Sequence, residues 1–188
     1  LTNDNAVRLL ANTIATGAGL FVLITAFANI SGAHLNPFVS LSMYLTKRIK
    51  GKELLTFIPA QILGCLLGVM LANVFFEHSI IELSTKNRDG FHIFLSEIVA
   101  TFGLIFIIFA TLKDGKTTVA ACVATYISAG YWFTSSTSFA NPAVAIARTF
   151  TDSFTGINYL NTPTYIFAEL LGTIAVSYTH LTLPTTVI

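Results

Sequence analysis

Long apolar segments alternate with short polar links along most of the chain. Five segments reach or approach the roughly 20 apolar residues that a helix needs to cross the hydrocarbon core of a bilayer. They cover residues 9–30, 54–76, 91–112, 119–133 and 164–176. The pattern predicts an all-α membrane protein in which these segments are transmembrane helices, the last two of them short.

Two further helix-like stretches, residues 37–46 and 142–150, are too short to cross a bilayer. Each follows an Asn-Pro pair, Asn36-Pro37 and Asn141-Pro142. Asn is a favourable N-cap, and Pro suits the first helical position because its missing N–H would be unpaired there. Each stretch is therefore predicted to be a half-helix that enters the membrane without spanning it.

Composition agrees with a membrane location. Of 188 residues, 54% are hydrophobic and only 10% charged, against about 25% charged in ordinary globular domains. The net charge of +1 leaves no basic surface for nucleic acid. Cys65 and Cys122 both lie within apolar segments, so they are interpreted as buried thiols.

Basic residues set the expected orientation. Lys47, Arg48, Lys50 and Lys52 follow the first half-helix, and Lys113 and Lys116 precede the fourth apolar segment. The positive-inside rule places these two links in the cytoplasm and the loop at 77–90 outside. The first half-helix then enters from the cytoplasm and the second from the outside.

The chain contains an internal duplication. The two Asn-Pro pairs lie 105 positions apart, and FIPAQILG at 57–64 matches YIFAELLG at 165–172. An odd number of spans separates the half-helices, so the two copies must run in opposite senses through the membrane. The sequence therefore predicts an inverted repeat.

The residues SGAHLNPF at 31–38 and SFANPA at 138–143 resemble the two Asn-Pro-Ala (NPA) boxes of the major intrinsic protein family, the aquaporins and aquaglyceroporins. The resemblance implies an aquaporin-like inverted-repeat helical bundle with two re-entrant half-helices. It also implies a passive channel, a homotetramer, and a multi-pass location in a bacterial plasma membrane.

The family pattern has six membrane spans. Compared with this pattern, residues 1–176 are expected to form a channel domain that lacks the first span and has a truncated last span. Residues 177–188 resemble no part of the family. They are interpreted as an unrelated tail, either an artefact of read-through or a divergent natural end.

The resemblance also assigns a pore constriction. Asn36, Pro37 and Phe38 meet Asn141, Pro142 and Ala143 near the midplane, where the two asparagine amides donate to passing water and interrupt proton hopping. Phe38 stands where the family has Ala, and it either narrows the midplane or packs into the wall. His34 and Glu97 are expected to support the two loops.

Family spacing places a narrower filter at Thr16, Ala129, Ser138 and Val144. Water-selective and glycerol-selective members carry Arg at the position that is Val144 here. Four small residues without a cation predict a wide filter, closest to bacterial aquaglyceroporins encoded with arsenic-resistance genes. The expected permeants are water, small polyols such as glycerol, and metalloid hydroxides such as arsenite.

Arg148 follows Val144 by four residues, hence on the same helical face and about 6 Å farther out. One hypothesis places it in the outer vestibule, where it replaces part of the missing cation. The alternative is that it pairs with Asp152 or with lipid headgroups.

Other functions are also compatible with the sequence. They are a water- or glycerol-selective channel without a metalloid role, a coupled secondary transporter, and a non-conducting structural protein. No nucleophile–His pair, metal cluster or phosphate loop is visible, so no enzyme activity, cofactor or metal is expected. The predicted partners are the lipid bilayer, water and small neutral solutes.

Overall fold

The computed structural model describes residues 4–182, and within that range the chain is helical without strands. The α-helices are α1 (Asn5–Phe27), α2 (Pro37–Leu45), α3 (Gly51–Phe75), α4 (Phe91–Thr111), α5 (Lys116–Phe133), α6 (Pro142–Ala147) and α7 (Thr162–Thr182), with short 3-10 helices η1 (Leu112–Asp114) and η2 (Arg148–Phe150). The all-α prediction is confirmed. Three helices, α1, α3 and α4 with its η1 extension, are long and apolar enough to cross a membrane.

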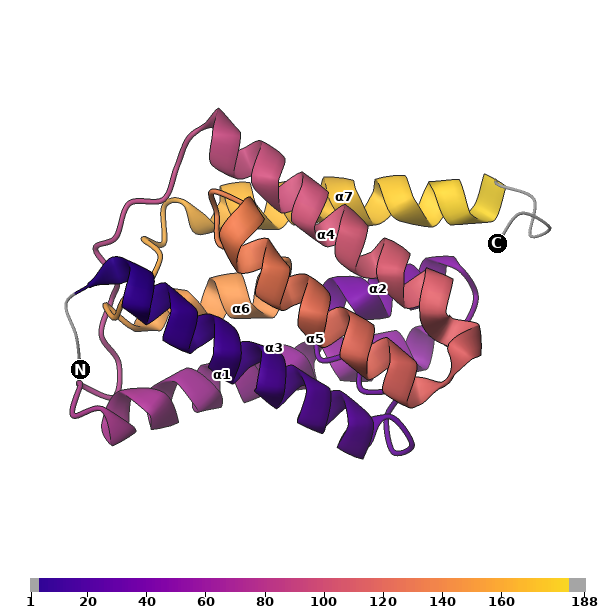
Figure 1. Cartoon of the computed structure of the whole chain (residues 1–188), viewed down its shortest axis with the longest axis horizontal. Helices are drawn as coiled ribbons and strands as arrows, with labels where there is room; N and C mark the ends of the chain where they lie inside the picture. Colours follow the sequence, from indigo (N-terminus) through magenta and orange to yellow (C-terminus); the bar gives the residue numbers. More distant parts are fainter. Residues whose placement is uncertain (1–3, 183–188) are drawn as a thin grey trace.

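The long helices surround the two short ones. Figure 1 shows α1, α3, α4, α5 and α7 running along the length of the molecule, with α2 and α6 between them near its middle. Helix α4 packs against α7 and α5, and α1 packs against α5, while α2 and α6 each contact α3 and α7. This arrangement holds both half-helices inside the bundle, where they touch each other.

Both half-helices begin as their Asn-Pro pairs predict. The Asn36 side-chain oxygen accepts from the backbone N–H of Phe38 at 2.9 Å, and Pro37 is the first helical residue. The Asn141 oxygen accepts from Ala143 N–H at 3.1 Å, and Pro142 follows in the same way. The caps satisfy backbone donors that the first turn of a helix leaves unpaired.

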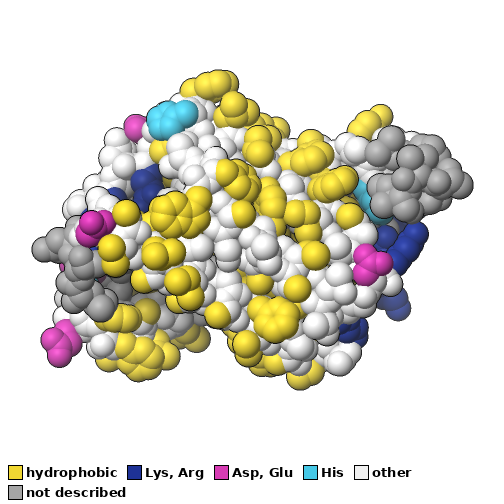
Figure 2. Space-filling model, in the orientation of Figure 1, with side chains coloured by type: hydrophobic (Ala, Val, Ile, Leu, Met, Phe, Trp, Pro, Cys, Tyr) yellow, Lys and Arg dark blue, Asp and Glu magenta, His cyan; other side chains and the backbone are white. Residues whose placement is uncertain are grey.

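The outside of the bundle is apolar. Large exposed hydrophobic side chains include Leu55, Leu67 and Phe75 of α3 and Ile14 of α1. Figure 2 shows hydrophobic side chains spread over the middle of the visible face and charged ones gathered toward its two ends. This distribution matches a surface that faces lipid at mid-depth and water at both ends.

Helix α7 continues past the boundary predicted at residue 176. Its hydroxyl residues end the apolar run, but they do not end the helix: Thr179 Oγ1 donates to the carbonyl of Ala175 at 2.8 Å, and Ser177 is buried. The first part of the predicted tail, 177–182, is therefore helical. Residues 183–188 of that tail lie outside the described residues.

Close helix approach depends on Gly172. A Cβ at this position would lie 2.6 Å from the carbonyl oxygen of Ile98 and 3.0 Å from the backbone nitrogen of Phe102. Both atoms belong to α4, so the absence of a side chain lets α7 touch the α4 backbone. The α4–α7 contact in turn positions Glu97 and Glu169, which hold the second pore loop.

Candidate pore and its outer constriction

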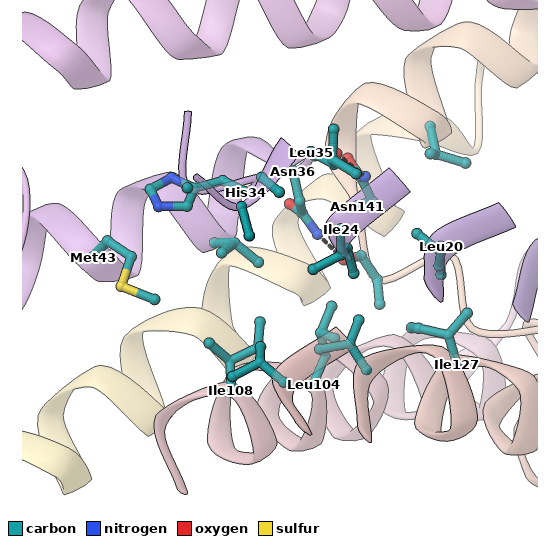
Figure 3. Close-up of a pocket in the computed structure, with 18 of the residues that line it drawn as sticks. Leu20, Ile24, His34, Leu35, Asn36, Met43, Leu104, Ile108, Ile127 and Asn141 are labelled. Atoms are coloured by element: carbon teal, nitrogen blue, oxygen red, sulfur yellow. Dashed lines mark hydrogen bonds between the residues drawn. The ribbon is translucent and has the colours of Figure 1, made fainter. Parts of the chain in front are cut away.

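A cavity of about 450 Å³ passes through the middle of the bundle. Thr16, Tyr131 and Arg148 line one end, the end that the charge bias predicts to be outside, and Arg48 and Lys116 line the other. Figure 3 shows Asn36, Asn141 and Leu35 close together, with Leu104, Ile108 and Ile127 across the cavity from them. The asparagine amides therefore lie on one wall, and the wall opposite them is aliphatic.

Asn36 and Asn141 form a reciprocal pair at the centre of the cavity. The Asn36 amide nitrogen donates to the carbonyl of Ala140 at 2.6 Å, and that of Asn141 donates to the carbonyl of Leu35 at 2.9 Å. Each side chain thus bonds to the residue that precedes the other asparagine. Because a primary amide carries two hydrogens, each nitrogen keeps a second donor beyond this bond, and both residues line the cavity.

The two residues that accept these bonds have left-handed backbones. Leu35 has a φ of +51° and Ala140 a φ of +47°. Non-glycine residues rarely adopt this conformation, which costs on the order of 1 kcal/mol. The conformation turns their carbonyl groups toward the opposite asparagine, so the reciprocal bonds and the backbone geometry depend on each other.

Two buried carboxyl groups hold the second pore loop. Glu97 of α4 accepts from the backbone N–H groups of Phe139 at 2.9 Å and Ala140 at 2.7 Å, and Glu169 of α7 accepts from that of Asn141 at 3.0 Å. Both side chains are fully buried. The structure thus gives Glu97 bonds of the kind expected for loop support.

The first loop is tied down through Ser40 instead of a carboxylate. His34 Nδ1 lies 3.0 Å from Ser40 Oγ, and the Gln61 amide donates to the same oxygen at 3.0 Å. The His34 ring also meets the Phe57 ring edge to face at 5.4 Å. His34 therefore bonds to a side chain of α2 and not to loop backbone, and it also lines the cavity.

The other predicted constriction residues lie behind the asparagines. Pro37, Pro142 and Ala143 are buried and Phe38 is half-buried, and none of the four lines the cavity. Phe38 therefore lies outside the cavity lining.

Three of the four predicted filter residues meet at the outer end of the cavity. Thr16, Ser138 and Val144 all line it. Ser138 is only 1% exposed and packs over Gly130, where an added Cβ would come within 2.6 Å of its hydroxyl oxygen. The close contact brings the second pore loop against the end of α5.

The fourth predicted filter residue, Ala129, is wrongly placed by the spacing argument. It is exposed on the outside of α5 and does not line the cavity. Val123, Ile127 and Tyr131 line it instead. Residues four apart share a helix face, whereas Ala129 lies two positions, or about 200°, from either neighbour.

Tyr131 is a cavity-lining residue that the family spacing does not predict. It is 4% exposed, and its hydroxyl donates to Thr16 Oγ1 at 3.1 Å. The helical repeat of Val123, Ile127 and Tyr131 was the signal that could have identified it. The structure thus adds a phenol ring to the three predicted filter residues that line the cavity.

Arg148 also lies in the cavity wall and does not pair with Asp152. Its Nη2 donates to the Tyr131 hydroxyl at 3.5 Å, and its guanidinium carbon stands 4.3 Å from the centre of the Phe139 ring. Asp152 instead accepts from the backbone N–H of Thr85 at 2.9 Å. This N–H bond is the main cause that lowers the pKa of Asp152.

The outer loops are joined by several such bonds. Arg88 donates to the carbonyl groups of Gly156 at 2.8 Å and Phe154 at 2.9 Å. Its guanidinium carbon also stands 5.7 Å from the centre of the Phe139 ring, the ring that Arg148 covers. These contacts tie loop 76–90 to the segment after η2 and fix the surroundings of Arg148.

An apolar helical bundle that encloses a cavity between two half-helices, with their capped N-termini meeting at its centre, defines a channel-type integral membrane protein. Comparison with known proteins gives the family: the model of the major intrinsic protein family matches residues 1–180. The chain belongs to the major intrinsic protein family, and its members of the aquaporin type are channels and not enzymes.

Individual relatives cover different parts of their own length. The chain is 47% identical to Aquaglyceroporin AqpS of Rhizobium meliloti (strain 1021), over 93% of this chain and 75% of that protein. It is 37% identical to Aquaporin TIP1-2 of Musa acuminata over 62% of this chain, and 28% identical to Aquaporin-4 of Bos taurus over 80%. It spans only 48% and 44% of the lengths of these last two proteins. The family supports passage of water and small solutes through a transmembrane channel.

Proposed function

We propose that the protein is a passive channel whose permeants include small neutral polyols such as glycerol and metalloid hydroxides such as arsenite, besides water. The observation that carries the proposal is the two-sided cavity. Asparagine amides and loop carbonyls on one wall can bond to hydroxyl groups, and aliphatic side chains on the other can contact a carbon backbone. A hydroxylated neutral solute presents both kinds of surface.

The charges along the cavity favour neutral solutes over cations. The described residues that line the cavity include no Asp or Glu. They do include three basic residues, Arg48, Lys116 and Arg148. A cation that loses water of hydration in this cavity meets no carboxylate that could replace it. The same observation weighs against a transporter that carries protons on a carboxyl group, and His34 is the histidine among the described residues that line the cavity.

A named relative points in the same direction. The protein of Rhizobium meliloti is called an aquaglyceroporin, a name that refers to glycerol as well as water. Because the two proteins are 47% identical over 93% of this chain, we propose a similar range of solutes for this protein.

A water-selective channel is the second candidate, and Tyr131 is the observation that favours it. A phenol ring bonded to Thr16 occupies the outer end of the cavity, where it reduces the space for solutes larger than water. Stopped-flow swelling of liposomes that contain the full-length protein, with water, glycerol and arsenite compared, decides between the two. Water flux without flux of either larger solute would contradict the proposed solute range.

Val144→Arg tests the outer end directly. The variant adds a long cation beside Arg148 in a half-buried cavity wall, so glycerol and arsenite flux should fall at least about tenfold, which corresponds to about 1.4 kcal/mol of barrier. Water flux should fall less. Val144→Leu, which adds volume without charge, is the matched control, and unchanged glycerol flux in Val144→Arg would contradict the assignment.

We further propose a homotetramer in a bacterial plasma membrane. The apolar face of α3, with Leu63, Leu67 and Leu71 more than half exposed, is available to lipid or to a neighbouring subunit. Chemical cross-linking in membranes followed by size analysis should give species up to a tetramer. A monomer under all cross-linking conditions would contradict the assembly.

A further inference from the structure

A directional chain of hydrogen bonds crosses the outer end of the cavity. Arg148 Nη2 donates to the Tyr131 hydroxyl at 3.5 Å, which donates to Thr16 Oγ1 at 3.1 Å, which donates to Asn12 Oδ1 at 3.3 Å. Each hydroxyl accepts from one neighbour and donates to the next, as its single hydrogen allows. The chain joins η2, α5 and α1, three separate walls of the cavity.

Tyr131 is held firmly in this chain. Its side chain is 4% exposed, and Gly130 beside it leaves room for Ser138 to pack on the end of α5. A buried phenol with partners on two sides has little freedom to swing away. Its ring is therefore a fixed part of the cavity wall at this end.

Arg148 keeps most of its donors available to the cavity. Among residues 4–182, no carboxylate lies within ion-pair distance of its guanidinium. Its described contacts are the Tyr131 hydroxyl and the face of the Phe139 ring. A guanidinium has five N–H groups, so the contact with the phenol uses few of them.

We propose that Tyr131 and Arg148 together form the outer constriction of the channel, with the tyrosine limiting solute size and the arginine supplying the cation that Val144 lacks. This inference rests on the proposed function and deepens it. The substrates it selects are compact uncharged solutes whose hydroxyl oxygens accept hydrogen bonds from the guanidinium. Solutes with longer carbon chains are hindered by the phenol, and cations are repelled by the charge.

Tyr131 variants test the size limit. In liposomes that contain the full-length protein, we expect Tyr131→Ala to raise the flux of a five-carbon polyol relative to water by about tenfold. Tyr131→Leu should give a smaller rise, and it serves as the second variant if the alanine protein does not fold. Tyr126→Phe is the matched control, because the Tyr126 hydroxyl bonds to the carbonyls of Val99 and Ala100 and the residue does not line the cavity.

Arg148 variants test the charge. Arg148→Gln should let guanidinium ions leak across the liposome membrane, whereas Arg148→Lys should restore their exclusion because it keeps the charge. A merely structural role for Arg148 would not separate these two variants by charge. Tyr131→Phe should shift the ratio of glycerol flux to water flux when Arg148 is present. The same substitution made in the Arg148→Gln protein should not shift this ratio, because the guanidinium that bonds to the Tyr131 hydroxyl is already absent.

The outcomes separate this inference from the proposed function. If the parent carries glycerol and Tyr131→Ala leaves the polyol-to-water ratio unchanged, the constriction is wrong and the proposed function stands. If the parent carries only water and Tyr131→Ala gains polyol flux, the constriction is supported and the proposed solute range is wrong. Ala129→Leu should change neither the ratio of polyol flux to water flux nor the leak of guanidinium ions. A larger effect of this variant than of the Tyr131 variants would also overturn the inference.

Discussion

Glu97 holds two neighbouring backbone N–H groups of the second pore loop with its two oxygens. The side chain is fully buried, so water cannot take its place. Buried backbone donors that lose their acceptor cost about 1–3 kcal/mol each. The loop therefore depends on having two acceptor atoms at this position.

Glu97→Gln tests that dependence with almost no change in shape. Its amide nitrogen would face the N–H of either Phe139 or Ala140, donor against donor, and one of the two bonds would be lost. We expect a stability loss of about 1–3 kcal/mol, measured as a lower thermal unfolding midpoint in detergent. Glu77→Gln, an exposed outer position, should leave the midpoint unchanged, and equal midpoints for both variants would contradict the role of Glu97.

At the level of helices, most boundaries could be predicted from sequence within a few residues. The Asn-Pro pairs fixed the starts of α2 and α6, because a cap and a proline act locally. The apolar pattern predicts too short an α7, because hydroxyl residues lower the hydropathy of this segment without breaking the helix. A threonine hydroxyl can bond to the carbonyl four residues earlier, as Thr179 does.

The filter could be predicted only in part, and the reason is geometric. Val144 lies on α6, three residues after the asparagine that caps this helix, so helix pitch alone gives its face. Thr16 and Ala129 are each separated from their asparagine by an irregular loop, with positive φ angles at Ala33 and Leu35 in the first loop and at Thr137, Ser138 and Ala140 in the second. Such residues change the direction of the chain, so a fixed spacing across them does not give the helix face, and of the two residues only Thr16 lines the cavity.

Gly172 provides a test of helix packing. Gly172→Ala would press a methyl group into the α4 backbone, 2.6 Å from the Ile98 carbonyl oxygen, and overpacking of this kind costs about 1–3 kcal/mol. We expect a lower unfolding midpoint and reduced water flux, because Glu97 and Glu169 lie on the displaced helices. Gly51→Ala, where the new methyl would meet only the Tyr44 ring at 3.6 Å, is the control and should be tolerated.

The connection between the outer loops should depend on pH. The Thr85 N–H, which bonds to the Asp152 carboxylate, holds the pKa of that group below its ordinary value of 3.8. A group whose pKa is lower in the folded state contributes stability above its unfolded pKa and loses it as the pH falls through the folded pKa. The contribution is therefore complete near neutral pH and declines below about pH 4.

Asp152→Asn isolates this effect. The variant should have a lower unfolding midpoint than the parent near neutral pH, and the difference should shrink as the pH falls below about 4. Asp89→Asn, an exposed position in the same loop region, corrects for the general effect of acid. A parent-to-variant difference that stays constant with pH would exclude a role for the ionised carboxylate.

For the whole molecule, the distribution of basic residues makes a firm prediction of orientation. The links after α2 and before α5, together with the first turns of the helices that follow them, carry six Lys and Arg residues, which the positive-inside rule places in the cytoplasm. Arg48 and Lys116 then line the cytoplasmic mouth of the cavity. The end of the cavity that Tyr131 and Arg148 line is accordingly predicted to open to the outside.

Cysteine labelling in intact cells checks the orientation. Lys86→Cys, in the predicted outer loop, should react with a membrane-impermeant maleimide added outside, and Lys52→Cys should react only after permeabilisation. The native Cys65 and Cys122 are half-buried within α3 and α5 and give the background, which is measured in the parent. The opposite labelling pattern would show that the channel has the reverse orientation in the membrane.

The reciprocal bonds of Asn36 and Asn141 also constrain the order in which the protein can mature. Each bond joins residues 104 or 106 positions apart, so the first pore loop cannot reach its final shape until the second has been synthesised. At roughly 5–20 residues per second, the ribosome needs about 5–20 s to deliver the partner. During that interval the strained backbone at Leu35 has no amide from Asn141 to hold it, and the nascent membrane protein has no finished pore through which ions or solutes could escape.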